Sequence, residues 1–283
     1  MFWFPKWVIT RFNIPVVSWL PGPPPRLKRR LICSLVSHPH FGLFAHGDTV
    51  KVLEDELGFV RGIEFEVIEP GVDLSLAEAY DPQKDVIRSN LNISSETVVG
   101  ITVARLIPIK NIHFLIEGLA LSVHELGVSI VWLIVGDGPE RSSLKQLVKA
   151  KGLEGCVHWL GQMQQSEVHR ILAAGDIFAL TSTYESFSMA TLEAMAHRLP
   201  IVATNVGYLR TIVQESGGGI LVNLRDFKGL AQAIAMLASD PDYRRQLGDR
   251  GHIYVQRFNW PNIIAKLLRF YEQVMVGRPC MKS

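Results

Sequence analysis

Residues 128–139 read Val-Ser-Ile-Val-Trp-Leu-Ile-Val-Gly-Asp-Gly-Pro, and this stretch carries the clearest fold signal in the chain. Its apolar part is rich in β-branched residues and shows almost no alternation of polar and apolar positions. Such a run is typical of a strand that is buried on both faces of a parallel sheet. A glycine turn, Gly136-Asp137-Gly138-Pro139, then closes the strand, and an amphipathic stretch begins. The stretch therefore predicts a β-strand followed directly by an α-helix.

The same unit recurs on both sides of this stretch. The other expected strands are 97–103, 157–160, 177–180, 201–204 and 219–222. The expected helices are 111–125, 140–151, 166–174, 189–197, 208–215 and 226–238, and a helical pattern over 241–275 is broken near Asn259-Trp260-Pro261. Asp226 and Asp240 are expected N-caps. Because parallel neighbours need helical crossovers, this alternation predicts an α/β fold with a doubly wound parallel sheet.

The first 70 residues show fewer such patterns. Residues 14–19 and 65–68 are expected strands, 48–57 an expected helix, and 21–25 a stiff proline-rich loop. These elements are too few to bury a complete sheet. We therefore expect an incomplete second domain at the N-terminus.

Composition limits the classes of function. The chain has 283 residues, 48% hydrophobic content and a net charge of +2, so charge gives no case for a nucleic-acid partner. Its three cysteines, Cys33, Cys156 and Cys280, are too widely spaced for a zinc motif or a disulfide framework. The expected location is therefore the cytoplasm.

The aromatic N-terminus, Phe2 to Phe12, has two interpretations. It lacks the basic start and cleavage site of a signal peptide. Prolines and charges also interrupt it well short of the ~20 apolar residues that span a membrane. One interpretation is a peripheral contact with the inner face of the membrane, helped by the basic run at 26–30. The other is a core segment of a domain whose partner elements are absent.

Charged side chains follow two of the expected strands. Arg105 and Lys110 come after the strand at 97–103, next to a helix N-terminus, where an anion such as a diphosphate is stabilised. Glu185 and Glu193 come after the strand at 177–180. On one helix, eight steps would separate these carboxylates by ~12 Å, which suits two hydroxylated ends of one ligand better than one reacting atom. Taken singly, each of these residues is better explained as solvated surface charge.

The combination of motifs resembles the retaining glycosyltransferases of group 1, also called family 4, which have the GT-B fold of two facing Rossmann-like domains. Four segments carry the resemblance: 67–73 is similar to the family's interdomain junction, 103–111 to its diphosphate loop, 135–139 to its second-strand turn, and 185–196 to its paired-glutamate motif. The resemblance runs from about residue 60 to 275. It implies a remnant of the acceptor domain at 1–72 and a donor domain at 73–283, whose last helix crosses back to the N-terminal part.

The resemblance also implies the roles of individual residues. Arg105, Lys110 and Glu185 would be catalytic: the two cations neutralise the leaving diphosphate, and Glu185 holds the donor sugar. The other donor-binding residues would be Gly136, Gly161, Met163, Ser186, Phe187, Ser188, Met189 and Glu193, with Glu193 on the ribose and Gly161 and Met163 near the base. The family needs no metal or cofactor, and the substrate would be a UDP- or GDP-linked sugar. The acceptor would be a carbohydrate or a lipid-linked hydroxyl, as in polysaccharide or glycolipid biosynthesis.

Some positions depart from the family pattern. Ser188 stands where glycine is usual, His197-Arg198 replaces a pair that normally ends in glycine, and Tyr208 follows Gly207 in place of a second glycine. The N-terminal glycine-rich loop of the family is also absent, so we expect a shortened acceptor domain or a late-started reading frame.

Two other functions stay open at this point. One is a non-catalytic module that binds a nucleotide sugar without a complete acceptor site. The other is a related sugar-nucleotide epimerase. A metal site formed by His38, His40, His46 and Asp48 is not expected, because their spacing matches no known cage.

Overall fold

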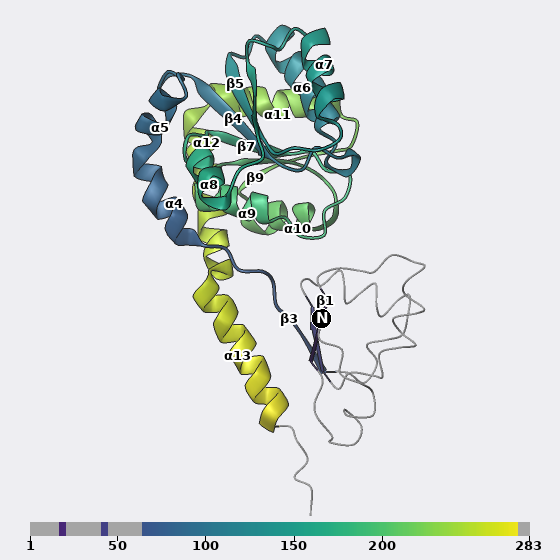
Figure 1. Cartoon of the computed structure of the whole chain (residues 1–283), viewed down its shortest axis with the longest axis vertical. Helices are drawn as coiled ribbons and strands as arrows, with labels where there is room; N and C mark the ends of the chain where they lie inside the picture. The colour runs from purple at the N-terminus through teal and green to yellow at the C-terminus, as the bar shows by residue number, and fades with distance from the viewer. Residues whose placement is uncertain (1–16, 21–40, 45–63, 277–283) are drawn as a thin grey trace, which may run out of the picture. The chain divides into compact units, whose positions relative to one another are not determined.

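The computed structural model describes residues 17–20, 41–44 and 64–276, with side chains from 67 to 272 (Figure 1). Its contacts divide the chain into two units, one of residues 1–71 and 260–283 and one of residues 72–259. The first unit contains a parallel sheet in the order β1-β2-β3 and the helix α13. The bounds are Val17–Leu20, Phe41–Phe44 and Glu64–Val67 for the strands and Trp260–Val276 for α13.

The first unit contains two of the strands expected from the sequence and one that was not expected. The strands at 14–19 and 65–68 correspond to β1 and β3 within the described residues, whereas β2 was not predicted. The expected helix at 48–57 lies outside the described residues. In the same unit, Ile263 and Phe270 of α13 bury Ile68, and Lys266 binds Glu69.

The second unit is built on a six-stranded parallel sheet in the order β6-β5-β4-β7-β8-β9. The strands are β4 (Val98–Val103), β5 (Ile130–Val135), β6 (Val157–Gly161), β7 (Ile177–Leu180), β8 (Ile201–Thr204) and β9 (Gly219–Val222). All five pairings are parallel. The chain starts in the middle at β4, winds outward to β6, and then returns to β7 on the other side. This order confirms the doubly wound sheet.

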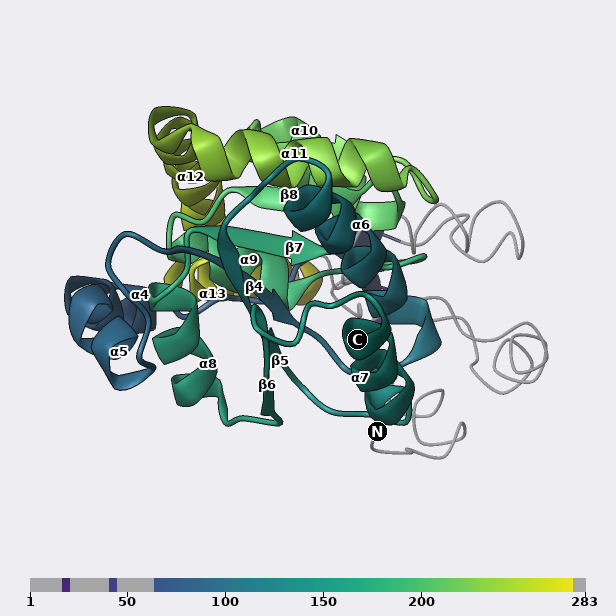
Figure 2. The ribbon, with the colours of Figure 1, turned by 90° about the horizontal axis from the view of Figure 1, so that it is seen from above.

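Helices cover both faces of this sheet. One apolar core joins it to α6 (Ile112–His124), α7 (Arg141–Ala150) and α11 (Phe227–Ser239). The other core joins it to α8 (Gln165–Ala173), α9 (Met189–Ala196), α10 (Gly207–Ser216) and α12 (Pro241–Val255). Figure 2 shows α6 and α7 on one side of the strands and α8 on the other. Because both faces are covered, the continuous apolar runs of the sequence are explained.

Helix ends follow the local sequence. Asp226 and Asp240 cap α11 and α12 by accepting from the N–H groups of Gly229 and Tyr243, as predicted. The predicted break after α12 is also confirmed, by a 3₁₀ turn over Gln256–Phe258 that precedes α13.

Three short helical segments were not predicted. They are α4 (Leu74–Tyr80), the 3₁₀ turn η1 (Asp81–Gln83) and α5 (Lys84–Asn90). The signal for the first is Asp73, whose carboxylate accepts from the N–H of Ser75 as an N-cap.

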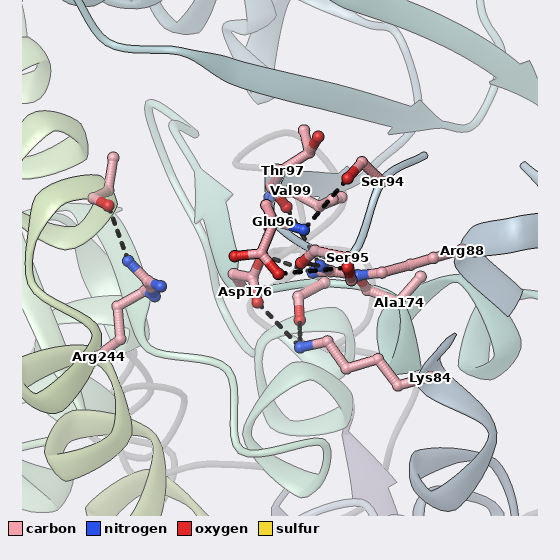
Figure 3. A network of polar contacts seen from close by, with 12 residues as sticks. Lys84, Arg88, Ser94, Ser95, Glu96, Thr97, Val99, Ala174, Asp176 and Arg244 are labelled. Carbon is pink, nitrogen blue, oxygen red and sulfur yellow. Dashed lines mark hydrogen bonds and ion pairs between the residues drawn. The ribbon is translucent and has the colours of Figure 1, made fainter. Parts of the chain in front are cut away.

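A buried arginine fastens this helical segment to the sheet (Figure 3). The Arg88 side chain is 4% exposed. Its guanidinium donates to the carbonyl oxygens of Ala174 at 2.9 Å, Ser95 at 2.9 Å and Thr97 at 3.1 Å. It also pairs with the Asp176 carboxylate at 2.5 Å. Arg88 therefore ties α5 to the loops that enter β4 and β7.

Asp176, just before β7, accepts further hydrogen bonds. Its carboxylate accepts from the Lys84 ammonium at 2.9 Å and from the Val99 N–H at 2.8 Å. Burial alone would raise the pKa of Asp176, but Lys84, the Val99 N–H and Arg88 together hold that pKa below its usual value. The ionised carboxylate of Asp176 therefore stabilises the fold fully at pH values above the ordinary pKa of aspartate. That contribution is lost as the pH falls through the lowered value.

The described residues form neither a membrane-spanning helix nor a cluster of metal ligands. None of their helices has both the length and the apolar character needed to cross a bilayer. No group of three or more His, Cys, Asp or Glu side chains in this part of the chain is arranged to hold a metal ion. His38, His40, His46 and Asp48 lie outside the described residues.

Candidate functional site

The candidate site lies where the strand order of the second unit reverses. β4 and β7 are neighbours, but the chain leaves β4 toward β5 and leaves β7 toward β8. Loops that diverge in this way open a crevice at the carboxyl ends of the strands, which is where open α/β sheets bind ligands. The loop after β4 spans 104–111 and includes the 3₁₀ turn η2 (Pro108–Lys110), and the loop after β7 spans 181–188.

Lys110 and Glu185 meet across this reversal point. Lys110 Nζ lies 2.6 Å from Glu185 Oε2, and the two side chains are 18% and 10% exposed. Ser182, which was not predicted as a site residue, donates its hydroxyl to the same Glu185 oxygen at 3.0 Å. The structure thus brings together two of the predicted catalytic residues and fixes the carboxylate with a third side chain.

Hydrogen bonds between the two loops hold this pair in place. The N–H of Thr183 donates to the carbonyl oxygen of Ile109 at 2.8 Å, and the hydroxyl of Thr181 donates to that of Asn111 at 3.0 Å. Asn111 itself has a φ of 50°, in the left-handed region that asparagine tolerates, and this turn starts α6. The two loops are therefore joined by one backbone hydrogen bond and one bond from a side-chain hydroxyl.

The glycine turn after β5 packs against the loop that carries Arg105. Gly136 has a φ of 130°, and a Cβ there would overlap the carbonyl oxygen of Ala104. Its N–H donates to the carbonyl oxygen of Gly161 at 2.7 Å, which joins the turn to the end of β6. Arg105 is exposed beside this contact. Gly136 is thus required for a close backbone approach, whatever its role toward a ligand.

The two predicted glutamates do not share a helix. Glu185 lies in the loop before α9, and Glu193 lies within α9, which begins at Met189. The condition behind the ~12 Å estimate is therefore not met. Ser188 caps α9 with its hydroxyl and is buried, at a φ of −119°. Because that φ is ordinary for any residue, serine in place of glycine causes no backbone strain here.

Tyr208, the residue that replaces a second glycine, contacts the loop after β7. Its N–H donates to the carbonyl oxygen of Glu185 at 2.9 Å. Its ring stacks on Phe187 with centroids 5.1 Å apart and an interplanar angle of 27°. This departure from the family pattern thus adds an aromatic contact that orders the segment around Phe187.

Gly207 precedes Tyr208, and its replacement by alanine is expected to lower the stability of the fold. At a φ of 44°, a Cβ on Gly207 would be strained and would also overlap the carbonyl oxygen of Glu185. We expect Gly207→Ala to lower the free energy of unfolding by at least ~2 kcal/mol, because the overlap adds to the 1–2 kcal/mol cost of the left-handed backbone. Urea unfolding of Gly127→Ala is the matched control. Gly127 has a φ of 67° but nothing within 4 Å of its Cβ, so equal losses in the two variants would contradict the overlap.

Glu193 has a different environment from Glu185. Its carboxylate lies 3.4 Å from Gln165 Nε2 and 4.0 Å from Nε2 of the fully buried His169. Burial raises the pKa of Glu193, against the lowering effects of Gln165 and His197. His169 was not predicted as a site residue.

The remaining predicted donor residues lie near β6 and in the segment from the loop after β7 to the start of α9. Met163 and Phe187 pack against the apolar core between the sheet and α8, α9 and α10. Ser186 is half-buried in the loop after β7, and Met189 is the first residue of α9. By helix geometry, the N–H groups of Met189 and Ala190 have no partner inside α9.

The second departure from the family pattern also has a structural explanation. Arg198, which stands where glycine is usual, has a φ of 55° and pairs with Asp249 at 2.6 Å. A left-handed backbone is the reason that glycine suits this position.

Sequence comparison identifies the family to which these motifs belong. The profile of the family described as "Glycosyl transferases group 1" matches residues 83–253, more than half of the chain. The chain belongs to this family. Like other members of this family, it has the α/β fold and doubly wound sheet expected of the GT-B class.

Curated relatives agree with this assignment. The chain is 28% identical over 219 residues to D-inositol 3-phosphate glycosyltransferase of Corynebacterium urealyticum, covering 74% of this chain and 51% of the relative. It is 28% identical to N-acetyl-alpha-D-glucosaminyl L-malate synthase of Bacillus anthracis, covering 74% and 56%. It is 31% identical to the lipopolysaccharide core glycosyltransferase LpsE of Rhizobium meliloti, covering 59% and 47%. The chain thus spans about half the length of these relatives.

Solved structures show the same fold. HepE of Anabaena in complex with UDP superimposes with a TM-score of 0.80 at 23% identity, covering 94% of this chain and 74% of HepE. Sucrose-phosphate synthase of Thermosynechococcus elongatus gives a TM-score of 0.76 at 25% identity, covering 90% and 63%.

Proposed function

We propose that this group 1 glycosyltransferase binds a nucleotide diphosphate sugar in the crevice between β4 and β7 and transfers the sugar, with retention, to an acceptor hydroxyl. The observation that supports the proposal best is the Lys110–Glu185 pair at 2.6 Å. It sets an ammonium beside a fixed carboxylate at the reversal point of the sheet. The ammonium has three N–H donors, so it can hold Glu185 and a phosphate oxygen at the same time.

Each neighbouring group has a role in this proposal. Arg105 and Lys110 stabilise the charge that develops on the leaving diphosphate, which is where electrostatic catalysis has its largest effect. The free N–H groups at the start of α9 bind the phosphates, because helix N-termini favour anions. Glu185 accepts hydrogen bonds from the donor sugar, and Glu193 accepts them from the ribose. With two cations on the diphosphate, the reaction needs no metal.

The ligands and names of similar proteins indicate which donors and acceptors to test first. HepE has been solved in complex with UDP and with UDP-glucose, so a UDP-linked hexose is the first donor to test and a GDP-linked sugar the second. The names of the relatives refer to inositol phosphate, malate and lipopolysaccharide core. We accordingly propose a hydroxylated carbohydrate or lipid-linked acceptor, with the reaction in the cytoplasm or at the inner face of the membrane.

A non-catalytic module that binds nucleotide sugars is the second candidate. It is favoured by one observation: Arg105, Lys110, Glu185 and Glu193 all lie in the single unit Val72–Asn259. Binding of a donor could therefore be complete without the first unit.

Calorimetric titration of the whole chain with UDP, GDP and ADP tests the proposal. We expect at least one nucleotide to bind with a Kd well below 1 mM, and binding no tighter than ~1 mM by all three would refute donor binding. Incubation with the bound donor sugar and an acceptor then separates the candidates. A new glycosidic bond supports the transferase, an epimerised free sugar indicates an epimerase, and no product indicates the binding module.

A further inference from the structure

A chain of hydrogen-bonded polar side chains leads from Asp81 to His169, whose ring lies next to the Glu193 carboxylate. Its members, here called the histidine relay, are Asp81 of η1, His197 at the end of α9 and His169 of α8. His197 Nδ1 lies 2.5 Å from the Asp81 carboxylate, and His197 Nε2 lies 2.9 Å from His169 Nδ1. His169 Nε2 is the end of the relay. It has no hydrogen-bond partner among the described residues, although it points toward Glu193 Oε1 at 4.0 Å.

The hydrogen bonds fix which nitrogen carries each proton. The Asp81 carboxylate can only accept, so His197 Nδ1 carries a hydrogen. In a neutral His197 the other nitrogen, Nε2, must then accept from His169 Nδ1. This leaves His169 Nε2 as a bare lone pair that faces the Glu193 carboxylate. Two acceptors cannot bond to each other, which accounts for the 4.0 Å separation.

One added proton reverses the direction of the hydrogen bond between His169 and His197. The hydrogen on His169 Nδ1 moves to His197 Nε2, and a proton from solvent binds His169 Nε2. His197 then carries the positive charge beside Asp81, while His169 stays neutral and changes only its tautomer. The bond between the two rings persists, and a new N–H at His169 Nε2 points to Glu193.

We propose that the histidine relay is a proton-controlled clamp on Glu193, in which uptake of one proton turns His169 Nε2 into a donor that holds the carboxylate. His169 is thus a positioning residue that acts through Glu193. The inference rests on the proposed role of Glu193 toward the donor ribose. With one oxygen fixed by His169, the carboxylate presents its other oxygen to the ribose hydroxyls in one orientation.

The surroundings of His169 favour this division of charge. Burial, and after it the charge of His197, lower the pKa of His169 to about 4, whereas Asp73 and Asp81 oppose the shift. The half-exposed Asp81 carboxylate contacts His197 and not His169, so an added positive charge is stabilised at the His197 end of the relay. The cations of the adjacent helix α5 are not available to the relay, because Lys84 and Arg88 bind Asp176.

NMR of the wild-type protein labelled with ¹⁵N-histidine tests the clamp without a ligand. Long-range ¹H–¹⁵N correlations distinguish the two neutral tautomers of a histidine ring. We expect His169 to change from Nδ1–H to Nε2–H as the pH falls from 8.5 to 5. An unchanged Nδ1–H tautomer over this range would overturn the inference, even if nucleotide binding is confirmed.

Variants connect the clamp to donor affinity. UDP-glucose is the probe, because its phosphates do not titrate between pH 5 and 8.5. We expect the Kd of the wild type for UDP-glucose to rise about 10-fold as the pH increases from 5 to 8.5. This change corresponds to the loss of about one charge-assisted hydrogen bond. His169→Gln carries a permanent N–H donor near the Nε2 position, so its Kd should stay low with no pH step. His169→Leu should bind weakly at every pH.

The control is His124→Gln, because His124 binds the Lys151 carbonyl oxygen at an exposed site outside the relay. It should keep the wild-type pH profile. If the two His169 variants behave alike, His169 has only a structural role and the clamp is wrong. If no variant and no wild-type sample binds UDP-glucose, the proposed donor fails, and the tautomer measurement alone decides the clamp.

Discussion

Replacement of Lys110 by alanine is expected to weaken the binding of UDP or GDP by about 10- to 150-fold. The range corresponds to the ~1.5–3 kcal/mol that hydrogen bonds to charged groups contribute. Lys110 holds its ammonium at 2.6 Å from Glu185, with limited exposure to water, so its contact with a diphosphate would be poorly screened. Isothermal titration calorimetry on the folded variant measures the change. An unchanged affinity would remove Lys110 from the site.

A second variant separates direct from indirect causes of that loss. Lys110→Ala also leaves the buried Glu185 carboxylate without its cation, and this carboxylate would repel a diphosphate. In the double variant Lys110→Ala/Glu185→Gln that repulsion is gone. We expect most of the loss to remain, because the phosphate contact is still missing. Lys149→Ala, which removes an exposed lysine from α7, is the control for net charge and should bind as the wild type does.

Replacement of Arg88 by methionine is expected to lower the free energy of unfolding by about 3–5 kcal/mol, the usual cost of removing one partner from a buried ion pair. The substitution keeps much of the apolar stem but leaves Asp176 and three carbonyl oxygens without the guanidinium. Urea unfolding followed by circular dichroism should show a lower midpoint with an unchanged m-value.

Lys84→Met is the matched control for Arg88→Met. Lys84 binds the same carboxylate, but its side chain is 39% exposed. Exposed ion pairs contribute little, so we expect a loss of at most ~1 kcal/mol. Equal losses in the two variants would show that burial of Arg88 does not decide its contribution.

The sheet was predictable because its signal is local. The strands at 177–180 and 201–204 have the bounds predicted from their apolar runs, because every residue in them is buried. The partly buried edge strand at 219–222 also has its predicted bounds. α4 and α5 were missed because seven-residue helices show barely two turns of periodicity. The four-residue strand β2, at Phe41–Phe44, was also missed.

The site was only partly predictable. That Lys110 and Glu185 both follow strands could be read from the sequence, but their pairing depends on β4 and β7 being neighbours. His169 has the spacing of a core residue in an amphipathic helix, and nothing near it in sequence marks it as different. Its partner His197 follows 28 positions later and attracted attention only as a departure from the family pattern.

The Arg88–Asp176 network lies at the amino ends of the central strands β4 and β7, and the Lys110–Glu185 pair follows their carboxyl ends. Asp176 immediately precedes β7, whereas Lys110 follows the end of β4, a six-residue strand that spans roughly 20 Å. Substitutions so far apart generally have additive effects on stability. Stabilising substitutions at the amino ends of the strands can therefore be combined with destabilising substitutions at the candidate site, and the gain at one end should offset the loss at the other.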